Sequence, residues 1–318
     1  MQPIGGYFEL ELSNGGHRFH DTPYTMKSGR SALQHILLQT KPALVYVPFY
    51  TCNALLEPFE QTNTPYRFYE LNDTLEPARH IDLKAGEMLV YVNYLDLKRD
   101  TVAMLSEKYK DKLIVDCTQA FFLKGNGVSW FFNSCRKFFG VPDGSYVYVP
   151  AGATLPLIAM QNENYIYDHL IKRFNGATFA GYDLFIKNEA LAGEGVMAMS
   201  RLSEYLLSQV DYAEVAQARK HNFDYLHSCF RDVNNFRCTA ADGVPMSYPL
   251  LLQQSIDKSV LSTQNIFIPT FWTDVLNRNM EGYAIEKELS THLLPLPVDH
   301  RYGVQDMEVM SDAIKRNL

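Results

Sequence analysis

The sequence predicts an α/β protein in which helices cover both faces of a mostly parallel sheet, followed by a small C-terminal α+β domain. Two observations favour this fold. Short apolar runs alternate with segments of helical periodicity along the first half of the chain. These runs are apolar at every position rather than at every second one, which is typical of parallel strands buried on both faces.

The first half of the chain supplies the strands and helices of the predicted sheet. The N-terminal stretch, with Gly5-Gly6 and Gly15-Gly16, indicates an irregular arm with short strands. Apolar runs then predict strands at residues 43–48, 66–71, 88–94, 113–116, 128–132 and 145–150. Helices are expected at residues 28–39, where Ser28 can cap the first turn, and at residues 51–59 and 101–110.

The pattern changes after about residue 160 and becomes mainly helical. Residues 164–208 have helical character, and residues 211–230 form a long amphipathic helix. Strands are expected at residues 244–252 and 265–272, and a last helix at residues 304–316. We therefore expect a large domain over residues 1–208 and a small C-terminal domain over residues 209–318.

Composition excludes several classes of function. The net charge of −7 argues against a nucleic-acid-binding protein, which needs concentrated Lys and Arg. Five cysteines without CxxC spacing predict neither a disulfide framework nor a zinc site, and the histidines add no metal-ligand cluster. No basic leader and no apolar run of roughly 20 residues is present, so we expect a cytoplasmic protein without a membrane span.

Two residues in the stretch from Leu113 to Val149 are candidates for chemistry. Asp116 ends an apolar strand, and Lys137 lies among aromatic residues next to Arg136. Apolar surroundings and a neighbouring cation both lower the pKa of a lysine, which makes its amine nucleophilic. The alternatives are a surface lysine and a carboxylate that only caps a turn. If both residues are functional, they fit pyridoxal phosphate. A carboxylate beside the pyridine nitrogen keeps this nitrogen protonated, and the protonated ring is the electron sink for a carbanion.

The phosphate of such a cofactor needs backbone N–H groups at the start of a helix. Ser28-Gly29-Arg30-Ser31 offers them, and Ser134 offers a hydroxyl three residues before Lys137. Gln119, three residues after Asp116, can hydrogen-bond the phenolic oxygen of the ring. A capped helix start is common, so this segment is weak on its own.

Taken in order, these motifs resemble the pyridoxal-phosphate-dependent sugar aminotransferases of fold type I, the DegT/DnrJ/StrS type. The phosphate segment stands here as Ser28-Gly29-Arg30-Ser31-Ala32-Leu33, the strand ending in Pro as VPFYTCN, and the acid-x-x-Gln signature as Asp116-Cys117-Thr118-Gln119. Lys137 takes the place of the Schiff-base lysine and is followed by Asp143-Gly144. Arg219-Lys220-His221-Asn222 and LLPLPVDHRYGVQDM resemble the helix and C-terminal segment of the small domain.

Three positions depart from the pattern of that family. Arg30 replaces the threonine of the phosphate segment, and Cys52 stands where many relatives stack an aromatic side chain on the pyridine ring. Phe132 replaces the usual serine five residues before the lysine, so Ser134 would take its place. The resemblance thus implies that Lys137, Asp116, Gln119, Gly29, Arg30, Ser134 and Cys52 surround the cofactor.

The resemblance implies an aminotransferase that moves an amino group from glutamate to a keto group of a nucleotide-activated sugar, in surface polysaccharide or amino-sugar biosynthesis. Lys137 would be the catalytic base and acid, and Asp116 would tune the ring. Relatives complete each active site with a second subunit, so a homodimer with shared active sites is expected. The alternatives are elimination or dehydration with the same cofactor, and a non-catalytic protein that binds sugar nucleotides.

Overall fold

A seven-stranded, mostly parallel sheet forms the centre of the first half of the chain. The computed structural model describes residues 10–12, 16–159, 166–177, 179–193, 195–237, 243–254 and 256–317. The sheet has the order β1-β7-β6-β5-β4-β2-β3, in which β2 to β6 run parallel and β1 and β7 pair antiparallel. Its strands are β1 (Tyr24–Met26), β2 (Leu44–Pro48), β3 (Tyr66–Tyr69), β4 (Glu87–Val92), β5 (Leu113–Cys117), β6 (Trp130–Asn133) and β7 (Ser145–Tyr148).

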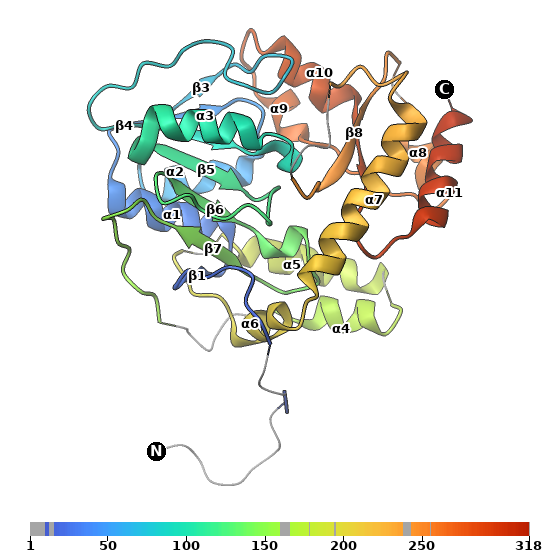
Figure 1. Cartoon of the computed structure of the whole chain (residues 1–318), viewed down its shortest axis with the longest axis horizontal. Coiled ribbons are helices and arrows are strands. Elements are labelled where there is room, and N and C mark those ends of the chain that lie inside the picture. Colours follow the sequence, from blue (N-terminus) through green and yellow to red (C-terminus); the bar gives the residue numbers. More distant parts are fainter. Residues whose placement is uncertain are drawn as a thin grey trace.

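Helices cover both faces of this sheet, with α3 on one face and α1 and α2 on the other (Figure 1). The helices of this half are α1 (Gly29–Thr40), α2 (Glu57–Gln61) and α3 (Arg99–Tyr109), with short 3₁₀ turns η1 (Asn53–Leu55), η2 (Tyr94–Asp96), η3 (Lys110–Lys112) and η4 (Cys135–Lys137). Three further helices follow β7: α4 (Asp168–Phe174), α5 (Tyr182–Leu191) and α6 (Arg201–Ser208), with η5 (Phe179–Gly181) before α5.

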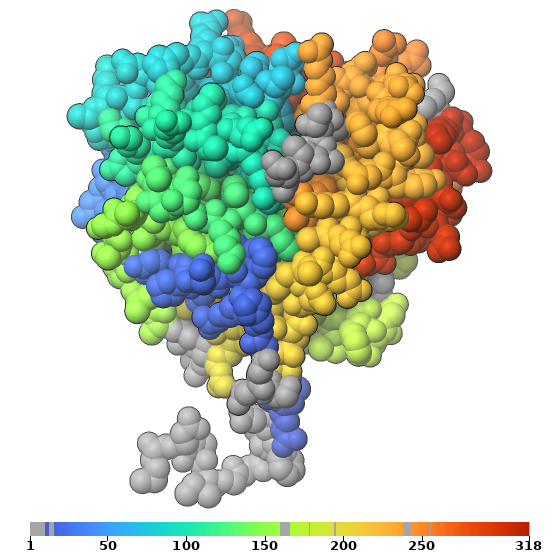
Figure 2. All heavy atoms as spheres, viewed as in Figure 1, coloured from blue at the N-terminus to red at the C-terminus, as the bar shows by residue number. Residues whose placement is uncertain are grey.

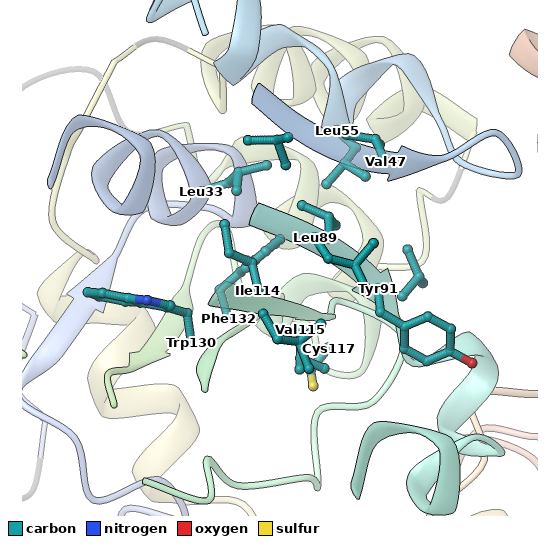
Figure 3. Packing of buried hydrophobic residues seen from close by; sticks show 14 of the residues in the cluster. Leu33, Val47, Leu55, Leu89, Tyr91, Ile114, Val115, Cys117, Trp130 and Phe132 are labelled. Atoms are coloured by element: carbon teal, nitrogen blue, oxygen red, sulfur yellow. The ribbon is translucent and has the colours of Figure 1, made fainter. Parts of the chain in front are cut away.

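Alternation along β5 decides which side chains meet which helix. Successive side chains of a strand point to opposite faces of the sheet. Ile114 lies on the side of Leu33 from α1, whereas Val115 and Cys117 lie on the opposite side (Figure 3). Asp116 has the same parity as Ile114, so its carboxylate emerges on the α1 face, at the carboxyl end of the strand.

The C-terminal part has its own small sheet and its own core. Strands β8 (Ser247–Leu251) and β9 (Leu293–Pro297) pair antiparallel. They pack with α7 (Tyr212–Phe230) and α11 (Val304–Lys315) around a core that contains Phe223, Tyr248 and Met307. The remaining helices are α8 (Lys258–Ser262), α9 (Thr273–Asn277) and α10 (Ala284–His292). The two halves lie side by side, as the blue-to-green and yellow-to-red surfaces show (Figure 2).

Most predicted elements of the large sheet are confirmed, but two details of the prediction are wrong. The strand expected at residues 265–272 is absent from the described chain, and β9 instead pairs with β8. The expected helical stretch of residues 164–208 is divided into α4, α5 and α6, and residues 164 and 165 lie outside the described part. The division at residue 208 remains a prediction. No helix in the described ranges has the length and apolar character needed to cross a membrane.

A buried carboxylate links the two halves. Asp96, in η2 at the end of β4, is fully buried and accepts hydrogen bonds from Arg99 at 2.8 and 2.6 Å and from Asn93 at 3.1 Å. It also accepts from the backbone N–H of Val244 at 2.8 Å, just before β8. Because a buried carboxylate must be compensated, this group fixes the approach of the C-terminal half to the sheet edge.

We predict that Asp96→Ala lowers the free energy of unfolding by about 3 kcal/mol, because Arg99 and the Val244 N–H lose a buried acceptor. Urea denaturation of the purified variant measures this loss. Asp100→Ala, an exposed acid on the adjacent helix, is the matched control and should cost clearly less. Equal losses in the two variants would contradict a linking role for Asp96.

Candidate active site

A cavity of about 90 Å³ lies where α1 begins, beside the carboxyl ends of β5 and β6. Six of the seven predicted site residues line it: Gly29, Arg30, Cys52, Asp116, Ser134 and Lys137. The other lining residues are Ser28, Leu33, Ala54, Leu55, Thr118, Phe132, Arg136, Glu189 and Ala192. The sheet topology therefore brings together residues that are separated by up to about half of the chain.

Asp116 is the buried acid of this cavity, with 4% of its surface exposed. Its Oδ1 accepts a hydrogen bond from the backbone N–H of Thr118 at 2.7 Å. Burial raises the pKa of Asp116 above its usual value, while the Lys137 cation and the hydrogen bond from Thr118 act in the opposite direction. A positive group placed against this carboxylate would therefore relieve an unfavourable burial.

Lys137 ends the 3₁₀ turn η4, which follows β6, and its Nζ lies 3.3 Å from the Oγ1 of Thr118. Thr118 thus contacts both Asp116 and Lys137. The predicted apolar surroundings of Lys137 are wrong, because its side chain is exposed. The neighbouring Phe138 and Phe139 turn away and pack into a separate aromatic core with Phe121, which anchors the turn from below.

The start of α1 forms the third wall. The Ser28 side chain caps the helix by accepting from the N–H of Ser31 and donates to the carbonyl of Ala192 at 2.5 Å. Gly29 is closely surrounded, because a Cβ at this position would lie 3.0 Å from Cγ2 of Thr118 and 3.4 Å from the carbonyl oxygen of Asn133. The backbone N–H groups of a first helical turn lack intrahelical partners, and here they face a cavity.

Four charged residues form a network over this helix start. Arg30 pairs with Glu57 at 2.9 Å and with Glu189 at 3.0 Å, and it also donates to the backbone carbonyl of Glu189 at 2.5 Å. Arg136 pairs with the same Glu189 carboxylate. Arg30, which stands where the family pattern has a threonine hydroxyl, therefore makes ionic contacts within the chain.

The remaining predicted site residues differ in their placement. The Cys52 thiol has its pKa raised by burial, with opposing influence from Lys137 and a further increase from Asp116, so it lies near both charges. Gln119 does not line the cavity. Its Oε1 accepts from the N–H of Leu95 at 3.1 Å, and its Nε2 is buried without a hydrogen-bond partner among the described residues.

Two polar residues of the cavity wall, Thr118 and Glu189, were not predicted from the sequence. Thr118 lies inside the Asp116–Gln119 signature, between the acid and the amide. This position in the sequence could have indicated that Thr118 lies at the site. Glu189 lies in the poorly matching region after residue 151, and nothing in its sequence context indicates that it returns to the start of α1. Only the packing of α5 brings it there.

We predict that Asp116→Asn stabilises the cofactor-free protein by about 1 kcal/mol at neutral pH, because a buried charge is removed. The pKa of Asp116 is raised in the folded state. The protonated carboxyl therefore contributes its full stabilisation of the fold below the ordinary pKa of 3.8, and this stabilisation is lost as the pH rises and the buried group ionises. The gain of the variant should therefore vanish toward pH 3.8.

Thermal unfolding at a series of pH values measures this difference. Asp111→Asn, an exposed acid two residues before β5, is the control and should leave the pH dependence unchanged. A wild type that is more stable than Asp116→Asn at neutral pH would contradict the unfavourable burial of the carboxylate.

Comparison with known proteins gives a match at the level of the fold. No family model matches the sequence, and no curated protein sequence matches it. Among solved structures, Spr1654 from Streptococcus pneumoniae in its PLP form matches with a TM-score of 0.64 and 13% identity, over 92% of this chain and 87% of the other. The sugar aminotransferase CalS13 from Micromonospora echinospora matches with a TM-score of 0.61 and 13% identity, over 92% and 87%.

A third solved structure, DesI with its TDP-sugar product, has a TM-score of 0.62 and 14% identity over 92% of this chain and 79% of the other. These matches extend over both halves of the chain. They confirm the predicted fold class: the chain has the fold that these structures share, with a mostly parallel seven-stranded sheet followed by a smaller C-terminal unit.

Proposed function

We propose that this chain is a pyridoxal-phosphate-dependent aminotransferase that moves an amino group from glutamate to a keto group of a nucleotide-activated sugar. The observation that carries the proposal is the meeting of Asp116, Lys137 and the start of α1 around one cavity. The fold shared with solved sugar aminotransferases supports it. The solved structure of DesI in the presence of its TDP-sugar product motivates the substrate class.

The residues present fit this cofactor. The buried carboxylate of Asp116 has a raised pKa, so it would be stabilised by a protonated pyridine nitrogen. The narrow space at Gly29 brings the backbone at the start of α1 close to the ends of β5 and β6, which suits a phosphate group. Ser134 and Arg136 line the same wall, and Lys137 supplies the amine that would hold the aldehyde covalently.

The bound cofactor supplies an electron sink for the bonding electrons of the donor α-carbon. The other parts of the reaction fall to the chain. Lys137, once its Nζ is free, would take the proton from the α-carbon as a general base and deliver it, as a general acid, to the C4′ carbon of the cofactor. Thr118 accepts a hydrogen bond from this Nζ and holds it 3.3 Å from its Oγ1, on the same side as Asp116. Cys52 lies beside these charges and would cover a face of the ring.

We predict that the purified protein incubated with pyridoxal phosphate gains a visible absorption band and that Lys137→Ala loses it. Glutamate should convert the bound cofactor to its amine form in the wild type, and Lys137→Ala should slow this half-reaction by at least about 10³-fold. Lys124→Ala, which lies outside the cavity, is the control. A wild type that stays colourless with the cofactor would refute the proposal.

The second half-reaction identifies the substrate. Nucleotide-linked keto sugars are supplied with glutamate, and the aminated product is detected by mass spectrometry. Amination of one of them supports a role in surface polysaccharide or amino-sugar biosynthesis. Loss of water or of a leaving group from the sugar without consumption of glutamate would instead favour an elimination reaction.

A homodimer with shared active sites and a cytoplasmic location are part of this proposal. Apolar side chains on α4, η5 and α5 are unusually exposed: Ile171, Phe174, Phe179, Tyr182, Phe185 and Ile186, with 89% exposure at Phe174. A second copy of the chain is the occupant that we propose for this surface, because α5 also forms a wall of the cavity. The four described cysteines are free thiols, which is consistent with a reducing compartment.

We predict that light scattering finds twice the chain mass of 36.4 kDa and that Phe174→Glu together with Phe179→Glu halves it. The charged side chains would be costly in an apolar interface but acceptable on a free surface. Val309→Glu, at an exposed apolar residue on α11, is the control and should leave the mass unchanged. An active wild-type monomer would contradict the shared site.

A further inference from the structure

Two arginine side chains, one from the first turn of α1 and one from η4, bind one carboxylate of their own chain. Arg30 and Arg136 each have 13% side-chain exposure, and both contact Glu189 near the end of α5. Glu57 pairs with Arg30 from the other side at 2.9 Å. Two positive and two negative charges therefore balance in this network, of which Arg30, Arg136 and Glu189 line the cavity. Each arginine is thereby paired in the ligand-free state.

The place that Glu189 occupies has the chemistry of an oxyanion site. Two guanidinium groups present several N–H donors each, and the start of α1 adds a partial positive charge. A carboxylate is an oxyanion, so the chain itself supplies the ligand. This internal ligand is direct structural support for the binding preference of the site, independent of the resemblance to other proteins.

In the ligand-free state the cavity, with Glu189 in its wall, is small for a cofactor. Its volume is about 90 Å³, whereas sites for small molecules usually measure roughly 300–1,000 Å³. Glu189 and Ala192 are part of its wall. Since the sheet edge and α1 are buried and close-packed, α5 and the residues after it are the wall that can yield.

The attachment of α5 is mainly polar. The side chain of Asn188 donates to the carbonyl of Pro142 at 2.7 Å, and Ser28 donates to Ala192. Gln61 donates to the carbonyl of Gly193 at 2.9 Å. Tyr182 and Ile186 of the same helix are exposed. A helix with few buried apolar contacts can move at a low cost in free energy.

We propose that Glu189 is a tethered counter-anion, which fills the oxyanion subsite at Arg30 and Arg136 in the ligand-free protein and is displaced when an external phosphate binds there. Displacement frees α5 and enlarges the cavity. This inference rests on the proposed function only for the identity of the molecule that carries the phosphate, which would be pyridoxal phosphate. A carboxylate of the amino donor is the other source of an oxyanion, and the experiment distinguishes the two.

The test uses inorganic phosphate as the probe, titrated into the cofactor-free full-length protein at low ionic strength by calorimetry. Glu189→Gln keeps the shape of the side chain but removes its charge, so phosphate should bind about tenfold more tightly. Asp183→Asn removes an equal charge from the exposed side of the same helix and should not change the affinity. Unchanged or weaker phosphate binding in Glu189→Gln would overturn the proposal.

Glutarate, titrated in the same way, tests whether the site prefers a carboxylate ligand. Tighter binding of glutarate but not of phosphate in Glu189→Gln would overturn the assignment to phosphate. Glu189→Ala is a second variant, and thermal unfolding verifies that both variants are folded. In the wild type, hydrogen exchange within α5 should accelerate when phosphate is added, and unchanged exchange would contradict displacement.

A cofactor pair separates this inference from the proposed function. Pyridoxal phosphate should bind Glu189→Gln more tightly than it binds the wild type, whereas pyridoxal, which lacks the phosphate, should bind both equally. If neither compound forms a visible band with the wild type, the proposed function fails, but the phosphate titration still tests the role of Glu189. An equal gain for pyridoxal would overturn the role of Glu189.

Discussion

The burial of the Asp116 carboxylate at the end of β5 is the constraint around which the site is built. Parallel pairing on both sides of β5 fixes the strand in the middle of the sheet. Side-chain alternation then places the acid on the face of α1. A buried acid with one backbone hydrogen bond is energetically unfavourable alone, so the fold accepts a cost in stability at the position where a cationic partner would bind.

The walls of the cavity differ in how firmly they are held. Val115 and Cys117, on either side of Asp116, and Ala32 and Leu33 of α1 belong to the main core. The aromatic cluster beneath η4 fixes the base of Lys137. The wall that contains Glu189 belongs to a short helix with an apolar outer face. Under the proposed function, the chemistry would lie on the rigid side and the ligand would enter on the movable side. If a second copy of the chain covers the outer face of α5, ligand entry would depend on formation of the dimer.

Strand positions and the grouping of Asp116, Lys137 and Gly29 could be predicted from the sequence, because buried parallel strands are apolar throughout and their carboxyl ends meet at one edge. The antiparallel pairing of β8 with β9 could not, since LLPLP has two prolines and no alternation. The exposure of Lys137 was missed because neighbouring phenylalanines in sequence pack into a core below it. Glu189 was missed because ion pairs between distant segments leave no periodic signal.

The antiparallel direction of β7 has a consequence for access to Lys137. A parallel successor to β6 would need a crossover connection, usually a helix, that leaves this edge and returns along a face of the sheet. Because β7 runs back beside β6, the chain between them stays at this edge of the sheet as a connection that contains Lys137. Such a connection can change in length without shifting the register of the strands. The reach of the amine can therefore evolve independently of the sheet that holds the acid.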